Sequence, residues 1–181
     1  MATNFSKKDM IKLQNLLRKS KKDMIKLQNL LRKSKKTITT AESCTGGLVA
    51  SLITKISGSS DIFNGSIVTY SNSIKNKELD VLNESLDKFG AVSKQVVSEM
   101  LDGVLKKFEA DFAIAISGVA GPNGGTKNKP VGTIVIGIAS NNNIKKIKTY
   151  HLKGSRISIQ KQSANIALSK ILKFVSKTID N

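Results

Sequence analysis

Hydrophobic residues along the chain alternate between strand-like and helical spacing from residue 37 onward. Residues 112–116 and 131–139 are continuous apolar runs, which are typical of strands buried on both faces of a sheet. Residues 93–109 instead place their apolar side chains on one side of a helix, with Ser93 as its predicted N-cap. Strands interleaved with helices predict an α/β protein, a three-layer α/β/α domain with a mixed sheet. Further strands are predicted at 37–41, 62–70 and 144–152, and further helices at 48–56, 73–82 and 155–178.

An exact repeat precedes this pattern, because residues 6–19 and residues 20–33 both read SKKDMIKLQNLLRK. Fourteen residues make two heptads, so a helix through both copies keeps nearly the same face. We predict that residues 1–36 form a basic helical extension of a domain at 37–181, with the inner copy docked on that domain. The apolar stripe of the helix consists of Met10, Leu13, Leu17, Met24, Leu27 and Leu31.

The outer copy, residues 6–19, then has three alternative arrangements: it protrudes, pairs with a neighbouring chain, or frays. A sharper alternative is a basic amphipathic helix that lies on anionic membranes or on nucleic acid. A lysine-rich polar face is, however, common on helices that pack against a core. We therefore favour docking of the inner copy, and we expect deletion of residues 6–19 to leave folding and activity intact.

The net charge of the chain is +17, of which +10 lies in residues 1–36 and +7 in residues 37–181. Such a charge is usual in proteins that bind nucleic acid. However, 27 of the 30 basic residues are lysines, so the arginines that read bases are nearly absent. Aromatic residues make up only 4% of the chain and Trp is missing, which leaves few platforms on which bases could stack. We therefore do not expect a nucleic-acid partner.

Composition excludes several other classes. The chain is 39% hydrophobic and 24% charged, as is typical of a globular protein. No apolar run reaches the roughly 18 residues that a transmembrane helix needs, and the N-terminus lacks the apolar core of a secretory signal. We therefore expect a cytoplasmic protein without a membrane partner. Cys44 is the only cysteine and His151 the only histidine, which excludes an internal disulfide and the usual Cys/His metal sites.

The first candidate for chemistry is the segment AESCTGG (41–47), which joins a predicted strand to a predicted helix. Ser43 there lies where free backbone N–H groups at a helix N-terminus favour developing negative charge. The alternative is that Ser43 or Thr45 merely caps the helix. The segment is not the G-x-S-x-G motif because Glu42 precedes the serine, and a single distant histidine argues against a Ser-His-Asp triad. Cys44 is a second candidate nucleophile, but no histidine lies nearby to activate it.

Two further segments follow predicted strands. SGVAGPNGGT (117–126) is rich in glycine, which lets the backbone approach a ligand closely, but it matches neither the dinucleotide fingerprint nor the Walker loop. By itself it is a weak indication of an anionic or nucleotide-like ligand. YSNSIK (70–75) lies where a strand gives way to a helix, as the sites of open α/β sheets do. Tyr70 and Lys75 could join Ser43 there, although each alone is typical of an ordinary strand-end or surface residue.

Together, AESCTGG, GSSDIFNGSIVTYSNSIK, GAVS (90–93) and SGVAGPNGGTKNKPVGT resemble the C-terminal domain of the CinA (competence/damage-inducible) family, the nicotinamide-nucleotide amidases. The resemblance covers residues 37–178 in the family's order. Longer members carry an N-terminal molybdopterin-binding-like domain that this sequence lacks, so we expect the stand-alone form. The family has one helix before the first strand, and the inner copy fits that place. The outer copy has no counterpart.

The resemblance implies hydrolysis of the carboxamide of nicotinamide mononucleotide to nicotinic acid mononucleotide and ammonia, with no metal or organic cofactor. Ser43 falls on the family's nucleophile, and Tyr70 and Lys75 fall on its partner positions. Lys75 must be neutral to act as a base, which requires its pKa to fall from about 10.4 to about 7. The other predicted substrate contacts, which include the N–H groups for the oxyanion and the loop for ribose and phosphate, are Thr45, Gly46, Gly47, Gly118, Ala120, Gly121, Gly124, Gly125, Thr126 and Arg156.

The sequence departs from the family at two positions near the last predicted helix. The family's Gly-Asp-Arg is Gly-Ser-Arg here, ending at Arg156, and a later arginine is replaced by Gln160. These missing charges bear on substrate affinity more than on chemistry. The alternative function is a CinA-like protein that binds a nucleotide or a partner without turnover, recruited by its basic N-terminal helix. The retained Ser43, Tyr70 and Lys75 favour the amidase, and we expect a homo-oligomer that acts on a small nucleotide substrate.

Overall fold

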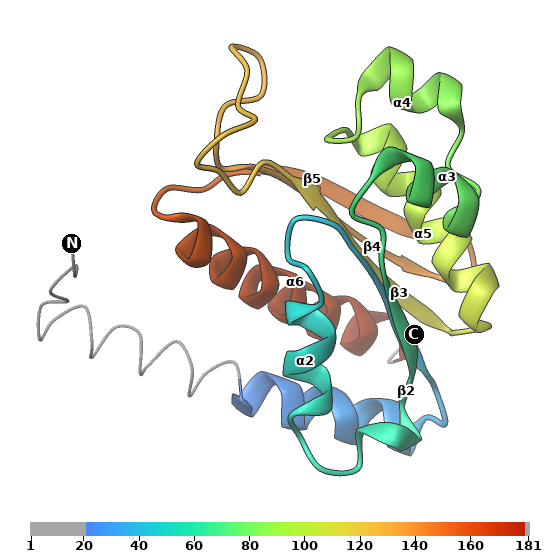
Figure 1. Ribbon diagram of the computed structural model, residues 1–181. Helices are drawn as coiled ribbons and strands as arrows, with labels where there is room; N and C mark the ends of the chain where they lie inside the picture. Colours follow the sequence, from blue (N-terminus) through green and yellow to red (C-terminus); the bar gives the residue numbers. More distant parts are fainter. Residues whose placement is uncertain (1–20, 180–181) are drawn as a thin grey trace, which may run out of the picture.

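The computed structural model describes residues 21–179 and is built around one five-stranded sheet (Figure 1). The strand order is β2-β1-β3-β4-β5, and the sheet is mixed because the first three strands run parallel whereas β4 is antiparallel to both of its neighbours. This architecture confirms the predicted α/β class. The strands are β1 (Ile38–Glu42), β2 (Phe63–Val68), β3 (Phe112–Gly118), β4 (Thr133–Ser140) and β5 (Lys145–His151).

Helices cover both faces of the sheet, as a three-layer domain requires (Figure 1). On one face α5 (Lys94–Phe108) packs on the strands, with α3 (Asn72–Leu79) and α4 (Asn83–Phe89) beside it. On the other face lie α2 (Leu48–Thr54), α6 (Arg156–Ile179) and the helical residues 21–33. A short 3-10 helix, η1 (Ser59–Asp61), leads into β2.

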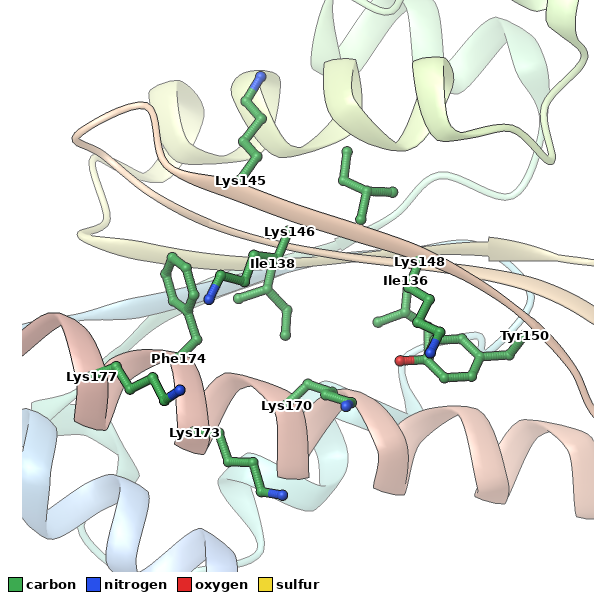
Figure 2. A pocket seen from close by; sticks show the side chains of 11 residues that line it. Ile136, Ile138, Lys145, Lys146, Lys148, Tyr150, Lys170, Lys173, Phe174 and Lys177 are labelled. Carbon is green, nitrogen blue, oxygen red and sulfur yellow. The ribbon is translucent and has the colours of Figure 1, made fainter.

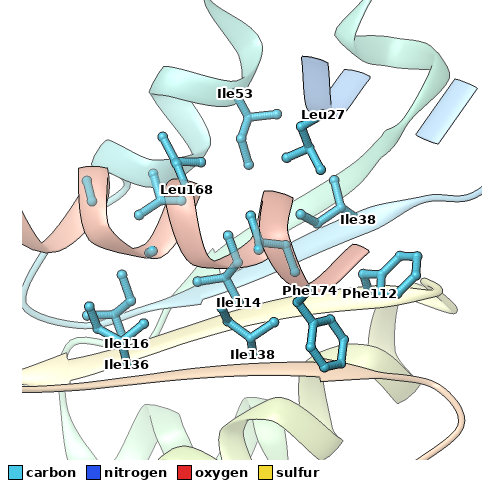
Figure 3. Close-up of a cluster of buried hydrophobic side chains, with 14 of the residues drawn as sticks. Leu27, Ile38, Ile53, Phe112, Ile114, Ile116, Ile136, Ile138, Leu168 and Phe174 are labelled. Carbon is cyan, nitrogen blue, oxygen red and sulfur yellow. The ribbon is translucent and has the colours of Figure 1, made fainter. Parts of the chain in front are cut away.

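The hydrophobic core is divided by the sheet into two clusters. Figure 3 shows the cluster beneath α6, where side chains from the helices meet those of β1, β3 and β4. Phe174 of α6 contacts Phe112 of β3 edge to face, with ring centroids 6.2 Å apart. The second cluster lies between the sheet and α5, and includes Val97, Met100 and Leu101. Strands β3 and β4 are therefore buried on both sides, as their continuous apolar sequences predict.

The inner copy of the repeat is part of the first cluster. Met24, Leu27 and Leu31 are each at most 1% exposed and pack with the core. Two polar residues of the same helix reach η1 and the turn before it: Gln28 Nε2 donates to Ser59 Oγ at 2.7 Å, and Arg32 donates to Asp61 at 2.9 Å. The prediction that the inner copy docks on the domain is thus confirmed over residues 21–33. The outer copy, 6–19, lies outside the described residues, and a division of the chain at residue 36 stays a prediction.

One helix was not predicted from the sequence. Helix α4 has no side-chain cap at its N-terminus, and no long amphipathic pattern marks it. It is held instead by Glu99 of α5, whose carboxylate accepts hydrogen bonds from the Leu82 N–H at 3.0 Å and from Ser85 Oγ at 2.6 Å. Because this anchor comes from a residue far along the chain, the local pattern of residues 83–89 does not show it.

The topology brings four chain segments to one edge of the sheet. The carboxyl ends of β1, β2, β3 and β5 all meet there, because these four strands point the same way. The neighbouring strands β1 and β2 are followed by helices on opposite faces of the sheet, α2 on the α6 side and α3 on the α5 side. Such a switch point opens a crevice in which α/β proteins place their ligands.

Candidate active site

Ser43 is the first residue after β1 and lies at this switch point. Its N–H donates to the Ile116 carbonyl of β3 at 3.0 Å, and its own carbonyl accepts from the Gly46 N–H at 3.0 Å. Gly46 and Gly47 have φ angles of 61° and 93°, a left-handed turn that glycine adopts without steric cost. The turn reverses the chain into α2 and leaves Ser43 8% exposed.

Glu42 holds this turn in place, a role that the sequence reasoning missed. Its side chain is fully buried, and its carboxylate accepts three backbone hydrogen bonds from the start of α2. The donors are the N–H groups of Gly47 and Val49, both at 3.1 Å, and of Ala50 at 2.8 Å. Since Gly47 offers no side chain as a cap, Glu42 supplies the capping oxygens from the preceding strand. The sequence does contain one indication of this capping role, because a glutamate stands five residues before the glycine at which the helix begins.

Lys75 reaches Ser43 from α3. The α3 helix begins with a cap in which Ser71 Oγ accepts from the Ile74 N–H at 3.2 Å, and Lys75 points inward from its first turn. Lys75 Nζ donates to Ser43 Oγ at 3.2 Å and to the Thr69 carbonyl at 2.7 Å. The residue is only 1% exposed, and its burial lowers the pKa of the amine below the ordinary value of 10.5. No carboxylate within residues 21–179 forms an ion pair with it.

Cys44, the other candidate nucleophile, is buried among core side chains. Burial raises the pKa of its thiol to about 12, so the group stays protonated near neutral pH. Its carbonyl accepts a hydrogen bond from Gln160 Nε2 of α6 at 2.8 Å. Cys44 thus acts as a packing residue whose backbone links the turn to α6.

Tyr70 does not hydrogen-bond to either member of the serine–lysine pair. Tyr70 is 62% exposed, and its hydroxyl accepts from Arg156 Nη2 at 2.7 Å. The other terminal nitrogen of Arg156 donates to the Gly121 carbonyl at 2.7 Å. Arg156 therefore connects the segment after β2 to the glycine-rich loop after β3, and it does so from the first turn of α6.

The predicted glycine-rich loop has two different halves. At Gly118 a β-carbon would lie only 2.8 Å from the Thr133 carbonyl of β4, so a side chain has no room there. Ala120 and Gly121 are buried next to the site, whereas Gly124, Gly125 and Thr126 are exposed on the projecting part of the loop (Figure 1). The projecting part is closed by a hydrogen bond from the Thr126 N–H to the Lys129 carbonyl at 3.0 Å.

The three N–H groups that were predicted to receive an oxyanion differ in availability. The Gly46 N–H donates to the Ser43 carbonyl and the Gly47 N–H donates to Glu42, so both already stabilise the turn. The Thr45 N–H donates no hydrogen bond within the described part of the chain. Its hydroxyl is also buried without a partner there. Of the three predicted donors, only the Thr45 N–H is therefore not already used within the described residues.

A cavity of ≈ 430 Å³ adjoins this turn. It lies between the start of α2 and the start of α6, and Thr45, Gly46, Gly47, Gln160 and Lys161 are among its lining residues. Its size falls within the range of small-molecule sites. Ser43 and Lys75 are not in the lining, so the cavity lies beside the serine–lysine pair.

Residues 21–179 contain neither a membrane-spanning helix nor a cluster of metal ligands. No helix among residues 21–179 combines the length and hydrophobicity needed to cross a membrane. Within the same residues, no group of three or more His, Cys, Asp or Glu side chains converges in a way that could hold a metal ion.

The fold and the site together define a three-layer α/β domain with a buried serine–lysine pair at the switch point of its sheet. The protein-family model of the CinA C-terminal domain matches residues 21–175 of this sequence, and the chain belongs to this family. The matched region includes the helical residues 21–33.

Individual relatives support the assignment. The chain is 56% identical over 137 residues to a CinA-like protein of Prochlorococcus marinus strain MIT 9312, and 46% identical over 141 residues to one of Fervidobacterium nodosum. These alignments cover 75% and 78% of this chain but only 32% and 34% of the relatives, so the chain spans about a third of their length.

Solved structures agree. The competence/damage inducible protein CihA from Agrobacterium tumefaciens has a TM-score of 0.83 at 34% identity, with 87% of this chain and 95% of that one covered. A CinA superfamily protein from Klebsiella pneumoniae has a TM-score of 0.83 at 29% identity, covering 87% of this chain and 98% of its own.

Proposed function

We propose that this chain is an amidase that hydrolyses the carboxamide of nicotinamide mononucleotide to nicotinic acid mononucleotide and ammonia. The observation that carries the proposal is the 3.2 Å hydrogen bond between Lys75 Nζ and Ser43 Oγ inside a buried site. A serine hydroxyl is a weak nucleophile until a neighbouring base takes its proton. Burial lowers the pKa of Lys75 and so favours the neutral amine that such a base must be.

In the acylation step, the neutral Lys75 amine takes the hydroxyl proton as Ser43 Oγ forms a bond to the carboxamide carbon. The carbonyl oxygen becomes an oxyanion, and the Thr45 N–H, which donates no hydrogen bond within the described residues, would donate to it. The Lys75 ammonium then returns the proton to the leaving nitrogen as the carbon–nitrogen bond breaks. Ammonia leaves, and the nicotinoyl group remains on Ser43 as an ester.

In the second step, water replaces ammonia. The again-neutral Lys75 takes one proton from a water molecule, whose oxygen bonds to the ester carbon. The carbon–Oγ bond then breaks, and the proton returns from Lys75 to Ser43. The products are nicotinic acid mononucleotide and the original pair.

The remaining contacts would hold the nucleotide. Tyr70 and Arg156 form one exposed, hydrogen-bonded pair. In this pair the tyrosine hydroxyl could steady the leaving amine, and the guanidinium could meet the phosphate. Arg156 uses its terminal nitrogens on Gly121 and Tyr70, but a guanidinium carries five N–H donors, so donors remain for a ligand. Gly118, Ala120, Gly121, Gly124, Gly125 and Thr126 would contact ribose and phosphate.

Incubation of the protein with nicotinamide mononucleotide and measurement of released ammonia tests the proposal. We expect release from the wild type and a loss of at least about a thousandfold in the Ser43→Ala variant, since both steps pass through the serine. If the wild type releases no more ammonia than Ser43→Ala, the amidase proposal is wrong and a nucleotide-binding role without turnover takes its place.

A further inference from the structure

A second cavity, of ≈ 560 Å³, lies between β5 and α6, and lysines dominate its rim (Figure 2). Lys146 and Lys148 reach into it from β5, whereas Lys170, Lys173 and Lys177 line it from α6, with the amine of Lys173 pointing away from β5. The apolar floor consists of Ile136, Ile138, Tyr150 and Phe174. We call this feature the lysine groove. No residue of the groove belongs to the candidate active site.

Four lysines of the groove form no ion pair with the described part of the chain. Lys146, Lys148, Lys170 and Lys173 take part in none of the ion pairs formed among residues 21–179. Their neighbour Lys145 points to the other face of the sheet, where it pairs with Asp102 of α5 (Figure 2). The sequence explains this asymmetry, because residues 112–179 contain no aspartate or glutamate. The groove is therefore a cationic surface that complements an anionic partner.

The groove also adjoins an open edge of the sheet. Strand β5 pairs with β4 on one side and with no other strand of the described sheet, so its outer N–H and C=O groups are available. Helix α6 packs mainly on β4 and β3, which leaves the α6-side face of β5 uncovered, whereas α5 packs on the opposite face. Lysines on β5 alone would be a common protection of an edge strand. The second row of lysines, on α6, is not part of the edge and lines the same cavity.

Several occupants fit this surface poorly. Pairing of β5 with a second copy of itself would set lysine opposite lysine, which is destabilising. The basic N-terminal segment carries the same sign of charge as the groove. Single-stranded nucleic acid binds through exposed aromatic rings on which bases stack. Here Phe174 is only 5% exposed, and the Lys146 ammonium lies 5.6 Å from the centroid of its ring. The Lys148 ammonium lies 5.6 Å from the centroid of the Tyr150 ring. Both rings are therefore poor platforms for a stacking base.

We propose that the lysine groove and the free edge of β5 form a docking site for an extended acidic peptide segment of a partner protein. The segment adds to the sheet beside β5 through backbone hydrogen bonds, as in other cases of strand addition. Successive side chains of a strand point to opposite faces, so every second residue of the segment faces the α6 side. Carboxylates at those positions lie between the lysines of β5 and those of α6. The other residues lie on the face where Ile147 and α5 are found.

A labelled peptide of four Glu-Val repeats, acetylated and amidated at its ends, tests this by fluorescence anisotropy with the full chain. We expect saturable binding that weakens as salt is raised, because exposed charges are screened. The Lys146→Glu/Lys148→Glu and Lys170→Glu/Lys173→Glu variants should each lower the affinity by at least about tenfold. The matched control is Lys26→Glu/Lys94→Glu, which makes the same change in net charge at exposed positions elsewhere and should leave the affinity within about twofold. Circular dichroism confirms that each variant is folded.

Two further probes separate strand addition from simple charge attraction. The same peptide with N-methyl groups on alternate residues, made in both registers, keeps its charge but cannot pair fully with β5, and at least one register should bind at least about tenfold more weakly. An oligothymidine of equal charge should bind more weakly than the peptide. The proposal is overturned if the peptide does not bind, if the control variant loses as much affinity as the groove variants, if N-methylation in both registers has no effect, or if the oligothymidine binds more tightly.

Discussion

Lys75 Nζ lies 3.2 Å from Ser43 Oγ, although the two residues are 32 positions apart and reach the site from helix α3 and from the end of β1. The pair is buried, and the Thr69 carbonyl fixes the amine from a second side at 2.7 Å. This geometry places a buried amine next to a hydroxyl, so the chemistry that we propose depends on the protonation state of one lysine.

That dependence predicts a pH profile. We expect kcat/KM for ammonia release to rise with pH as Lys75 loses its proton, with a midpoint below the ordinary lysine pKa of 10.5 because burial disfavours the charged amine. Lys75→Arg keeps the positive charge but cannot become neutral, and it should lower kcat by about 10²–10⁴. A steady-state pH series on the wild type measures the midpoint. A profile without an ascending limb below pH 10.5 would contradict the role of Lys75 as base.

The same burial links stability to pH. In the interval between the lowered pKa of Lys75 in the folded chain and 10.5 in the unfolded chain, the unfolded state binds one more proton. The free energy of unfolding of the wild type should therefore rise with pH relative to Lys75→Met, by at most about 1.4 kcal/mol for each pH unit. Urea unfolding of both proteins across this interval measures the difference. A constant difference would mean that the pKa of Lys75 is the same in both states.

Glu42 should contribute strongly to stability through the start of α2. Glu42→Ala removes three charge-assisted hydrogen bonds from N–H groups that are buried or partly buried, and should lower the free energy of unfolding by about 2–4 kcal/mol. Thr54→Ala serves as the control, because this exposed hydroxyl bonds only to carbonyls of the same helix, and it should cost less than about 0.5 kcal/mol. Chemical denaturation compares the two. Equal effects would show that the Glu42 carboxylate does not anchor the turn.

Cys44 should be dispensable for catalysis. With the pKa of its thiol raised to about 12 by burial, almost no thiolate exists near neutral pH. We expect Cys44→Ala to keep kcat within about twofold and to lose at most about 1–2 kcal/mol of stability from the lost packing. Iodoacetamide should alkylate the folded protein slowly. Loss of activity in a Cys44→Ala protein that remains folded would point to the thiol as the nucleophile.

Arg156 should contribute to substrate binding only when it makes both of its hydrogen bonds, to Gly121 and to Tyr70. A lysine in its place keeps the charge but cannot bridge the Gly121 carbonyl and the Tyr70 hydroxyl with one planar group. We expect Arg156→Lys to lower kcat/KM by about tenfold, mainly by raising KM, and Lys153→Arg, at an exposed position nearby, to have no effect. Steady-state kinetics with nicotinamide mononucleotide separates the two parameters.

Much of this fold could be predicted from the sequence because its signals are local. The continuous apolar runs of β3 and β4, and the single apolar face of α5, are read from consecutive residues. The face of the inner repeat that carries Met24 and Leu27 is buried for the same reason. Helix α4 could not be found in this way, since Glu99 anchors it from another helix.

In the candidate site, too, the features marked by local motifs could be predicted, whereas those formed by contacts between distant segments could not. The motifs pointed to Ser43 and Lys75, and the structure places their side chains in contact. The capping role of Glu42 and the link from Arg156 to Tyr70 depend on distances between segments that the linear pattern does not contain. The lysine groove likewise appears only when β5 and α6, which follow each other in the chain, lie side by side (Figure 2).

The proposed amidase reaction requires Ser43 to carry the acyl group during turnover. The direct measurement is mass spectrometry of peptides from enzyme that is mixed with nicotinamide mononucleotide and quenched in acid within one turnover. We predict a nucleotide-acyl adduct on the peptide that contains Ser43, and none in the Ser43→Ala variant. Undiminished ammonia release by Ser43→Ala, with no adduct on the wild-type peptide, would contradict the claim.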